Sequence, residues 1–476
     1  MKSTFEKFIR FEEENCLFKS KHRDTYYWHL IRTWVYYSIL KDTSCYDDLK
    51  NKQGTAPNIA RKIATVASNS LINLKQFPYR KNRCDVLFSN MYDYRKVNGE
   101  DKDIFIDFFD IDRSITTKKF EYNDQFHISN KADINSCYSD FRMILNYSFY
   151  KLRKMALSSH EQISFNNLVE KINKEFEVNL SKDVVINRIL YSMTIWKSYY
   201  YSMRDCLEKI NPKIVVMVNA YGLRHFATTK AAKDLGIATV ELQHGVIAPL
   251  HIDYNFSDIE NSHHYFPDYI FTFGQYWNGA CRTPAQCKKI GVGYAYIDYI
   301  EGQLEEGMSR DLDTIVFYST QEVKFAEFVG RFADLISVKG YTIIFKYHPI
   351  ECGKISYPSL NKQNIQVIDE PEEVHKYLSN YEHHVSVGST VLFEAAIRGA
   401  SIYVLNEAGK EYMEELLDSG YGSLIENEND LFQRISEFHE TKNKKVVKLL
   451  LEKNANRNIN EELLKILAKK ERLKNE

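Results

Sequence analysis

A Gly-Ser-Thr triplet separates an apolar strand from a helix in the second half of the chain. Residues 384–387 are predicted to form a short buried strand, and Gly388, Ser389 and Thr390 follow it at the start of a helix. The first turn of a helix leaves backbone N–H groups unpaired and carries the positive end of the helix dipole, which favours bound anions. The triplet is therefore a candidate phosphate site. The alternative is an ordinary N-cap, because Ser and Thr are preferred there in any protein.

Glu394 lies one turn inside the same predicted helix. A carboxylate at this point can accept hydrogen bonds from both hydroxyl groups of a ribose, which would place a nucleoside beside the phosphate. A carboxylate near a helix N-terminus also interacts favourably with the helix dipole. The sequence leaves both roles open.

Further polar residues follow other predicted strands. Ser319 and Thr320 come directly after an apolar run, and His348 stands two residues after Lys346, the last residue of the next predicted strand. A histidine can donate to a phosphate oxygen, and Lys346 adds positive charge if its ammonium group reaches the same place. Each of these residues taken alone also fits an exposed loop, where histidines are common.

Gln243, His244 and Gly245 end a predicted strand in the first half of the chain, over residues 237–242. Their position at a strand end is the same as that of His348. One such site is readily explained as an exposed loop. Four of them, at the strand ends of two predicted sheets, are harder to explain in that way.

Two series of alternating strands and helices must position these residues. The first covers the strands predicted at 213–218, 237–242 and 269–274, and the second begins with strands at 314–320 and 341–346. Continuous apolar runs separated by helices are typical of parallel sheets buried on both faces. The fold class is therefore α/β, with two Rossmann-like domains that face a cleft. Ligands of such sheets bind at the carboxyl ends of the strands, where the polar residues lie.

The chain of 476 residues divides into four predicted parts. Residues 1–296 form an N-terminal, acceptor-side domain with a helical region at 1–80, an insertion or helical lobe at 110–180 and a Rossmann-like part at 182–296. Residues 297–312 are polar and acidic and form the linker. Residues 313–440 form the C-terminal, donor-side domain. Residues 441–476 form a basic, amphipathic tail that either crosses back onto the first domain or is a solvated end.

Composition and motifs exclude several classes of function. Lys+Arg (63) balance Asp+Glu (64), which indicates no nucleic-acid partner. The sequence has neither a GxGxxG dinucleotide fingerprint nor a GxxxxGK[ST] phosphate loop. The eight cysteines form no CxxC pairs, and neither His263-His264 nor His383-His384 has a third ligand at helical spacing. We expect no metal site and no resident cofactor.

The chain is predicted to be cytoplasmic. It shows no signal peptide at its N-terminus and no uncharged apolar run long enough to span a bilayer. The aromatic segment Thr25–Leu40 is either a buried helix or a surface that docks on lipid headgroups at the inner face of the membrane.

The order of these motifs resembles that of bacterial surface-polysaccharide glycosyltransferases of GT-B fold. Gln243-His244-Gly245, Lys346-Tyr347-His348-Pro349, and Gly388-Ser389-Thr390 with Glu394 and Gly399 are similar to short motifs of sialyltransferases, Kdo transferases and CDP-glycerol glycerophosphotransferases. The resemblance covers roughly residues 213–425, about half the chain.

The resemblance implies a role for several residues. His348, Ser389 and Thr390 would bind the donor phosphate, and the donor would be a CMP- or CDP-activated compound. His244 would be the catalytic base, as in the glycerophosphotransferases. In sialyltransferases the base is an acid of another motif, whose match here, Glu305-Glu306-Gly307, falls in the predicted linker.

The resulting hypothesis is a metal-independent glycosyltransferase that transfers a sugar from a nucleotide-activated donor to a growing capsule or O-antigen glycan or glycolipid. His244 is the proposed catalytic residue, and Gln243 and Gly245 lie on the acceptor side. The proposed donor-binding residues are Ser319, Thr320, Lys346, His348, Gly388, Ser389, Thr390 and Glu394. A nucleotide-sugar epimerase of the same fold and a non-catalytic binding protein of polysaccharide assembly are the alternatives.

Overall fold

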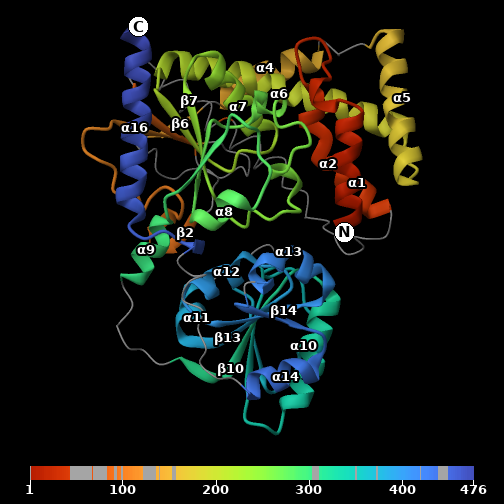
Figure 1. Cartoon of the computed structure of the whole chain (residues 1–476), viewed down its shortest axis with the longest axis vertical. Helices are drawn as coiled ribbons and strands as arrows, with labels where there is room; N and C mark the ends of the chain where they lie inside the picture. The colour runs from red at the N-terminus through yellow and green to blue at the C-terminus, as the bar shows by residue number, and fades with distance from the viewer. Residues whose placement is uncertain are drawn as a thin grey trace.

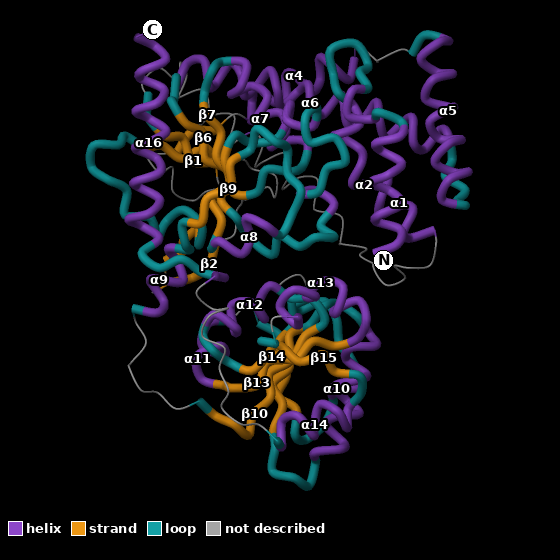
Figure 2. Tube along the Cα trace, in the orientation of Figure 1, coloured by secondary structure: helices purple, strands orange, loops and turns teal. Residues whose placement is uncertain are grey.

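The structure is a computed structural model. It describes residues 2–42, 67, 83–89, 94–97, 100–121, 136–138, 140–152, 157–302, 310–348, 351–370, 374–418, 420–437 and 449–475. Figure 1 shows two α/β domains, the first above and the second below, and Figure 2 shows the strands at the centre of each.

The first domain is built on a seven-stranded sheet with the order β5-β4-β1-β6-β7-β8-β9. Every neighbouring pair in it is parallel. The strands are β1 (Val86–Ser89), β4 (Thr117–Glu121), β5 (Ser136–Tyr138), β6 (Ile214–Val218), β7 (Ala238–Leu242), β8 (Tyr269–Thr272) and β9 (Lys288–Gly291), and a separate antiparallel hairpin joins β2 (Tyr94–Val97) to β3 (Glu100–Asp103). All residues of β6 and β7 are buried, as expected for apolar runs in the middle of a parallel sheet.

The second domain has a six-stranded sheet with the order β12-β11-β10-β13-β14-β15. Its strands, again all parallel, are β10 (Asp311–Tyr318), β11 (Thr342–Lys346), β12 (Ile365–Ile368), β13 (Tyr381–Ser386), β14 (Ser401–Leu405) and β15 (Gly422–Ile425). Side chains of β10 alternate between the two faces. Ile315 and Phe317 pack with α10 (Val323–Ile336) and α14 (Glu428–Ser436), whereas Val316 and Tyr318 belong to the cluster that includes α11 (His375–Asn380) and α12 (Thr390–Ile397). The sheet is therefore covered on both faces, as predicted.

Helices of the first domain surround its sheet. The long helix α6 (Lys182–Ile210) packs against α2 (Tyr27–Asp42), α4 (Asp140–Leu152), α5 (Ser159–Phe176) and α7 (Leu223–Asp234). In α2, Trp28, Ile31, Val35 and Tyr36 are almost completely buried. The buried-helix interpretation of this aromatic segment is thus the one that the structure supports. The predicted helical region beyond Asp42 lies outside the described residues, Ala67 excepted.

Residues 110–180 were only partly anticipated as a helical lobe. The segment contains α4 and α5, but it also contributes β4 and β5 to the main sheet. In β4, Phe120 is fully buried whereas Thr117, Lys118 and Lys119 are half-buried, so the strand lacks the continuous apolar run that identifies a central strand. The prediction of an insertion or helical lobe was therefore wrong for these two strands.

The predicted linker at 297–312 is too long at both ends. Helix α9 (Ala295–Glu301) buries Ile297 and Ile300, and strand β10 already begins at Asp311. The acidic residues of this segment led to the prediction of a linker, although its first part is a short helix with two isoleucines in the core. Residues 303–309, including Glu305-Glu306-Gly307, lie outside the described residues.

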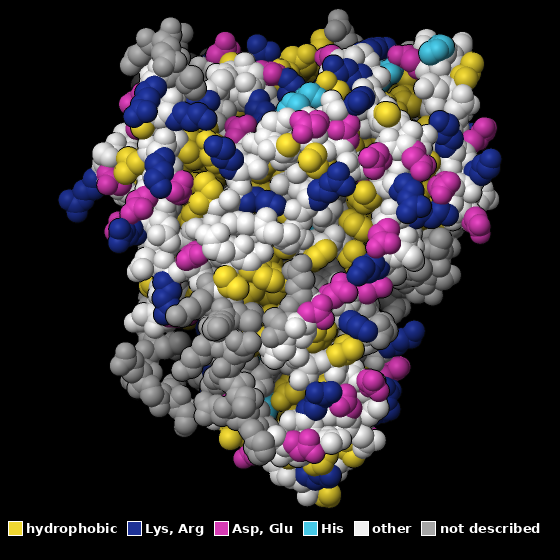
Figure 3. Space-filling view, viewed as in Figure 1, with side chains coloured by type: hydrophobic (Ala, Val, Ile, Leu, Met, Phe, Trp, Pro, Cys, Tyr) yellow, Lys and Arg dark blue, Asp and Glu magenta, His cyan; other side chains and the backbone are white. Residues whose placement is uncertain are grey.

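The C-terminal helix α16 (Ala455–Asn475) lies on the first domain (Figure 1). Asn456 and Asn460 accept hydrogen bonds from the backbone N–H groups of Asp110 and Asp112 at 2.9 and 2.8 Å. Farther along the helix, Lys213 donates to Glu471 at 2.8 Å. The chain therefore returns from the second domain to the first, and Lys and Arg side chains gather along the outer edge that α16 forms (Figure 3). The overall arrangement is the GT-B architecture expected from the sequence. None of the helices within the described residues is long and apolar enough to cross a bilayer.

Candidate functional site

Three of the predicted donor segments lie side by side in the second domain. His348 follows β11, Ser319 and Thr320 follow β10, and Gly388 follows β13 by two residues. These strands are consecutive in the sheet order, and the parallel pairing puts their carboxyl ends on one edge. The chain leaves β10 towards β11 and β12 and then returns to β13 on the other side. The carboxyl ends of β10 and β13 therefore flank the topological switch point, where ligands of open α/β sheets bind.

Ser389 is the N-cap of α12. Its hydroxyl accepts from the backbone N–H of Val391 at 3.3 Å, so it caps the helix as the simpler interpretation required. Thr390 is the first residue of the helix, and Gly388 lies in the bend before it. Capping uses one lone pair of the Ser389 oxygen and leaves its hydroxyl hydrogen free to donate. The capping role and the phosphate role are therefore compatible.

The turn that carries His348 is held by a buried carboxylate. The backbone N–H of His348 donates to Glu351 at 3.0 Å, and the hydroxyl of Tyr357 donates to the other oxygen of the same carboxylate at 2.6 Å. Glu351 is fully buried. Pro349 of the predicted His-Pro motif lies outside the described residues. Glu351 thus holds the backbone of His348 in place.

The two hydroxyl residues after β10 differ in their contacts. Ser319 accepts from the backbone N–H of Gln321 at 3.1 Å, in a turn where Gln321 has φ of 67°. The Thr320 hydroxyl is buried and has no hydrogen-bond partner within the described part of the chain. An unpaired buried hydroxyl is costly unless a ligand or water pairs with it. Of the two residues, Thr320 is therefore better placed to contact a nucleotide-activated donor.

Lys346 lies in a different layer from the strand-end residues. Its side chain is buried, its ammonium group donates to the carbonyl of Glu370 at 3.4 Å, and it stands 5.8 Å from the ring centre of Tyr377 in α11. These contacts place the charge between the sheet and α11. A direct contact of Lys346 with a donor stays a prediction.

Glu394 faces two basic side chains. Its carboxylate lies 3.6 Å from Nδ1 of His375, and the guanidinium of Arg398 lies 3.0 Å from the same nitrogen. The ring of His375 packs edge-on against Tyr296 of the first domain, with 4.8 Å between the ring centres. Glu394 is thus part of a polar cluster near the domain boundary, which adds a structural role in this cluster to the two roles open from the sequence.

In the first domain, Gln243 braces the turn after β7. Its amide nitrogen donates to the carbonyl of Gly245 at 2.8 Å, and its amide oxygen accepts from the backbone N–H of Phe273 at 2.8 Å. The side chain is buried. These contacts use the amide within the domain, so Gln243 shapes the turn that presents its neighbour His244.

His244 lies against the ring of Tyr221. Its Nε2 lies 3.1 Å from the hydroxyl of Tyr221, and its Nδ1 is buried with no partner within the described residues. Burial, with a smaller contribution from His251, lowers the pKa of His244 to about 4. The imidazole is therefore neutral near pH 7, the state that a general base requires.

The two sets of residues meet where the domains face each other. A β-carbon added to Gly245 would lie 3.5 Å from the Thr390 hydroxyl. Beside this point Trp277 of the first domain packs against Phe393 of α12, with 4.9 Å between the ring centres. The turn after β7 and the N-terminus of α12 therefore lie opposite each other where the two domains meet.

The sequence interpretation missed Tyr221 and its surroundings. The tyrosine follows β6 by three residues and contacts His244, His251 and Tyr254, with 5.6, 5.4 and 5.6 Å between ring centres. Tyr254 in turn donates to the buried carboxylate of Glu241. The strand-end rule that selected His244 applies equally to Tyr221, and it was the available signal.

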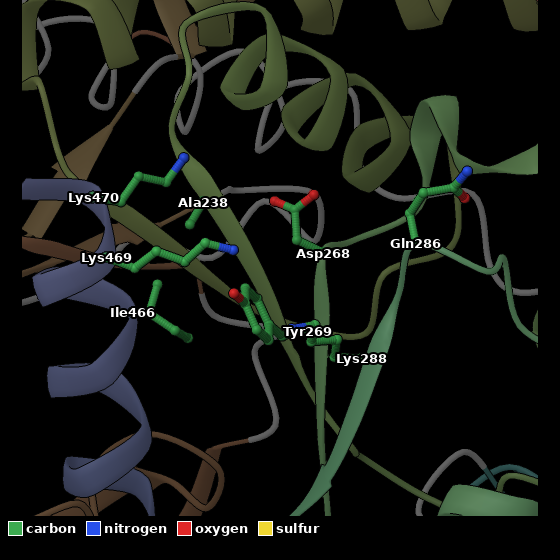
Figure 4. A pocket seen from close by; sticks show the side chains of 8 residues that line it. All are labelled: Ala238, Asp268, Tyr269, Gln286, Lys288, Ile466, Lys469 and Lys470. Carbon is green, nitrogen blue, oxygen red and sulfur yellow. The ribbon is translucent and has the colours of Figure 1, made fainter. Parts of the chain in front are cut away.

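A separate hollow lies at the opposite edge of the first sheet, against α16 (Figure 4). Its volume is about 250 Å³, and it is lined by the beginnings of β7, β8 and β9 and by Lys469 and Lys470 of the helix. This edge holds the amino ends of the strands, whereas ligands of parallel α/β sheets bind at the carboxyl ends. We therefore place the candidate site at the carboxyl ends of the strands, where the two domains meet. The described residues contain no group of three His, Cys, Asp or Glu side chains suited to a metal ion.

Neither a protein-family model nor a curated protein matches the sequence. Among solved structures, UDP-GlcNAc 2-epimerase from Neisseria meningitidis, bound to UDP-GlcNAc, has 14% identity over 80% of this chain and 99% of its own, with a TM-score of 0.44. UDP-GlcNAc 2-epimerase from Methanocaldococcus jannaschii has 14% identity over 79% of this chain and 98% of its own, with a TM-score of 0.45. The calicheamicin glycosyltransferase CalG4 has 11% identity over 74% of this chain and 91% of its own, with a TM-score of 0.43. These similarities are weak, and the fold described above rests on the sheet topology.

Proposed function

We propose that the chain is a glycosyltransferase that takes a sugar from a nucleotide-activated donor. The observation that carries this proposal is the meeting of two strand-end sites: Gly245, next to His244, faces Thr390 at the N-terminus of α12. One side offers hydroxyl groups and helix N–H groups suited to a phosphate. The other offers a neutral imidazole suited to deprotonating a hydroxyl. A reaction that joins a hydroxyl to a phosphate-activated sugar needs both.

In the proposed reaction His244 takes the proton of an acceptor hydroxyl, whose oxygen attacks the anomeric carbon of the donor. The bond from that carbon to the donor phosphate breaks, and negative charge grows on the leaving phosphate. His348, Ser389, Thr390 and the first N–H groups of α12 would stabilise this charge by hydrogen bonds. Thr320 and Glu394 would contact the remainder of the nucleotide. This scheme assigns no step to a metal ion or a cofactor.

A cytidine nucleotide is the donor that we favour, and a bacterial surface glycan or glycolipid is the proposed acceptor. Both choices rest on the motif resemblance. The donor choice is tested by the shift in melting temperature that CMP, CDP, UDP and UMP produce. If only the cytidine nucleotides shift the melting temperature, the choice of donor is supported. If only UDP does, the donor carries uridine in place of cytidine. No shift with any of the four nucleotides contradicts nucleotide-donor chemistry altogether.

A His348→Ala variant tests the donor-phosphate site. It should lose most of the nucleotide-induced shift and about 10²-fold or more in transfer rate, because a charge-stabilising donor is removed. His263→Ala is the control; this partly exposed histidine of the first domain contacts the carbonyl of Glu260 and the ring of His264. Full transfer by a folded His348→Ala protein would overturn the assignment.

Incubation with a nucleotide sugar alone separates transfer from epimerisation. A transferase leaves the sugar configuration unchanged and forms glycan only when an acceptor is added. An epimerase changes the configuration with no acceptor present, and proton NMR of the recovered nucleotide sugar detects that change.

A further inference from the structure

Tyr221 occupies the topological switch point of the first sheet. The chain leaves β1 towards β4 and β5 and then returns to β6 on the other side of β1. The carboxyl ends of β1 and β6 therefore flank the position where a ligand of this sheet is expected. Tyr221 follows β6 by three residues and lies beside His244, which follows the neighbouring strand β7.

The backbone of Tyr221 is fixed from both sides. Its N–H donates to the side chain of Asn219 at 2.8 Å, and its carbonyl accepts from Nδ1 of His225 at 2.9 Å. Asn219 and Gly222, on either side of it, have φ of 71° and 97°. A non-glycine residue in the left-handed region costs free energy and persists where the surrounding structure holds it, often at functional sites.

The ring of Tyr221 is fixed as well. It packs nearly perpendicular to His251 and to Tyr254, with interplanar angles of 86° and 87°. Tyr254 is anchored in turn by its hydrogen bond to the buried Glu241. The hydroxyl of Tyr221 therefore has little freedom to move away from Nε2 of His244, which lies 3.1 Å from it.

A neutral imidazole carries its single proton on one of its two nitrogens, and the hydrogen bond at one nitrogen decides what the other can do. If Nε2 carries the proton and donates it to the oxygen of Tyr221, Nδ1 has a free lone pair. If Tyr221 donates to Nε2, Nδ1 carries the proton and cannot accept another. In either case the buried Nδ1 lacks a partner within the described residues, so it is the ring nitrogen that can still pair with a ligand group.

We infer that Tyr221 is a positioning residue that holds His244 in the tautomer protonated on Nε2, with Nδ1 offered to the acceptor hydroxyl. The inference rests on the proposed role of His244 as base. The acceptor hydroxyl donates to Nδ1, and its proton moves there as the oxygen's electron pair forms the new bond to the anomeric carbon. The imidazolium so formed keeps its Nε2–H donated to Tyr221, which stabilises the positive charge. This is the base-and-orienter arrangement known from catalytic triads, with a phenol in the orienting position.

Nitrogen NMR of the whole protein, labelled with ¹⁵N-histidine, tests the inference without any substrate. The ¹⁵N shifts distinguish a protonated from an unprotonated ring nitrogen, and a His244→Gln variant identifies the His244 signals among those of the 14 histidines. At pH 7 we expect a protonated Nε2 and an unprotonated Nδ1. The opposite tautomer, or equal populations of both, would overturn the inference while leaving nucleotide binding and transfer to be judged separately.

Tyr221→Phe provides the matched variant because it removes only the hydroxyl. We expect it to mix the two tautomers of His244, to lower kcat by about 10²-fold and to leave KM for the donor nearly unchanged. Tyr199→Phe, a partly buried tyrosine of α6 outside this cluster, is the control. A Tyr221→Phe protein with an unchanged tautomer would contradict the positioning role. If the variant does not fold, the tautomer of His244 measured in the unaltered protein still tests the inference.

Discussion

Ser389 can cap α12 and hold a phosphate at the same time, and a pair of N-cap variants separates the two roles. Ser389→Ala should cost about 1 kcal/mol of stability through the lost cap and should also reduce the melting-temperature shift caused by a bound nucleotide. Asn427→Ala is the matched control, because Asn427 caps α14 through the N–H groups of Asn429 and Asp430 away from the strand-end site. It should cost similar stability and leave the nucleotide shift intact. If the nucleotide raised the melting temperature of both variants equally, Ser389 would act only as a helix cap.

Glu241 is a buried carboxylate whose deprotonation should weaken the fold as the pH rises. Burial raises its pKa to about 8, above its ordinary value of 4.5. When the pKa of a group is higher in the folded than in the unfolded protein, the group contributes its full stability below the pKa of the unfolded state. That contribution is lost as the pH rises through the pKa of the folded state. The fold should therefore lose stability from this group between about pH 4.5 and pH 8.

Glu241→Gln removes that dependence, because a neutral amide can still accept the hydrogen bond from Tyr254. The variant should be more stable than the unaltered protein at pH 8, by on the order of 1–3 kcal/mol, and similar to it at pH 5. Urea unfolding at the two pH values measures the difference. A Gln variant that is equally destabilised at both pH values would indicate lost packing instead of a lost charge.

At the scale of elements, a buried ion pair joins the N-terminal helices to the loop after β7. Arg32 donates to Glu12 at 2.7 and 2.9 Å and also to the backbone carbonyls of Ile252 and Asn255 at 2.5 and 2.9 Å. Glu12 and Arg32 are both almost fully buried. The helices that precede the first sheet thereby fix the loop that carries His251 and Tyr254, and through them the surroundings of Tyr221.

Arg32→Met should be strongly destabilising because it leaves Glu12 as an unpaired buried charge. We expect a loss of about 3–5 kcal/mol, whereas replacing both partners with apolar residues should recover part of it. Lys182→Met is the control. It breaks the exposed pair with Glu170 and should cost at most about 1 kcal/mol. Denaturant unfolding of the three proteins tests the ordering, which a loss below 1 kcal/mol for Arg32→Met would contradict.

The sequence revealed those elements whose physical signals are local. Strands β10 and β11 each contain a continuous apolar run, at residues 315–318 and 343–345, and were predicted from it, because both faces of the sheet are covered. Strand β4 was missed because only Phe120 of its residues 117–120 is fully buried. Helix α9 was taken for linker because its acidic residues outweighed two buried isoleucines.

The candidate site shows the same division between local and distant signals. Strand ends are visible in a sequence, so His244, His348 and Ser389 could be selected. Tyr221 also follows a strand end and could have been selected in the same way, but its hydrogen bond to His244, 23 positions away, is not visible in the sequence. The internal contacts of Gln243 and the buried position of Lys346 likewise depend on packing that no local pattern encodes.

At the scale of the whole molecule, the close approach of Gly245 to Thr390 sets the spacing of the two domains. Gly245→Leu would fill the space in front of Thr390 and should push the domains apart. We expect a larger radius of gyration in X-ray scattering, retained nucleotide binding and about a 100-fold loss of transfer rate, because the reacting groups would be misplaced by an ångström or more. Gly279→Leu, where a β-carbon meets nothing within 4 Å, is the control. An unchanged radius of gyration would mean that this contact does not set the spacing.

The return of α16 makes the first domain discontinuous along the chain. The segment that carries Leu450 receives a hydrogen bond from Trp277 at 2.8 Å, and a β-carbon at Gly274 would lie 2.4 Å from the carbonyl of Leu449, so the segment fits tightly against residues made much earlier. During synthesis the domain that begins the chain cannot be completed until its last residues have left the ribosome. The second domain, contiguous in sequence, can fold before the first is finished. Synthesis that stops short of Leu449 would therefore yield a folded second domain attached to an incomplete first domain.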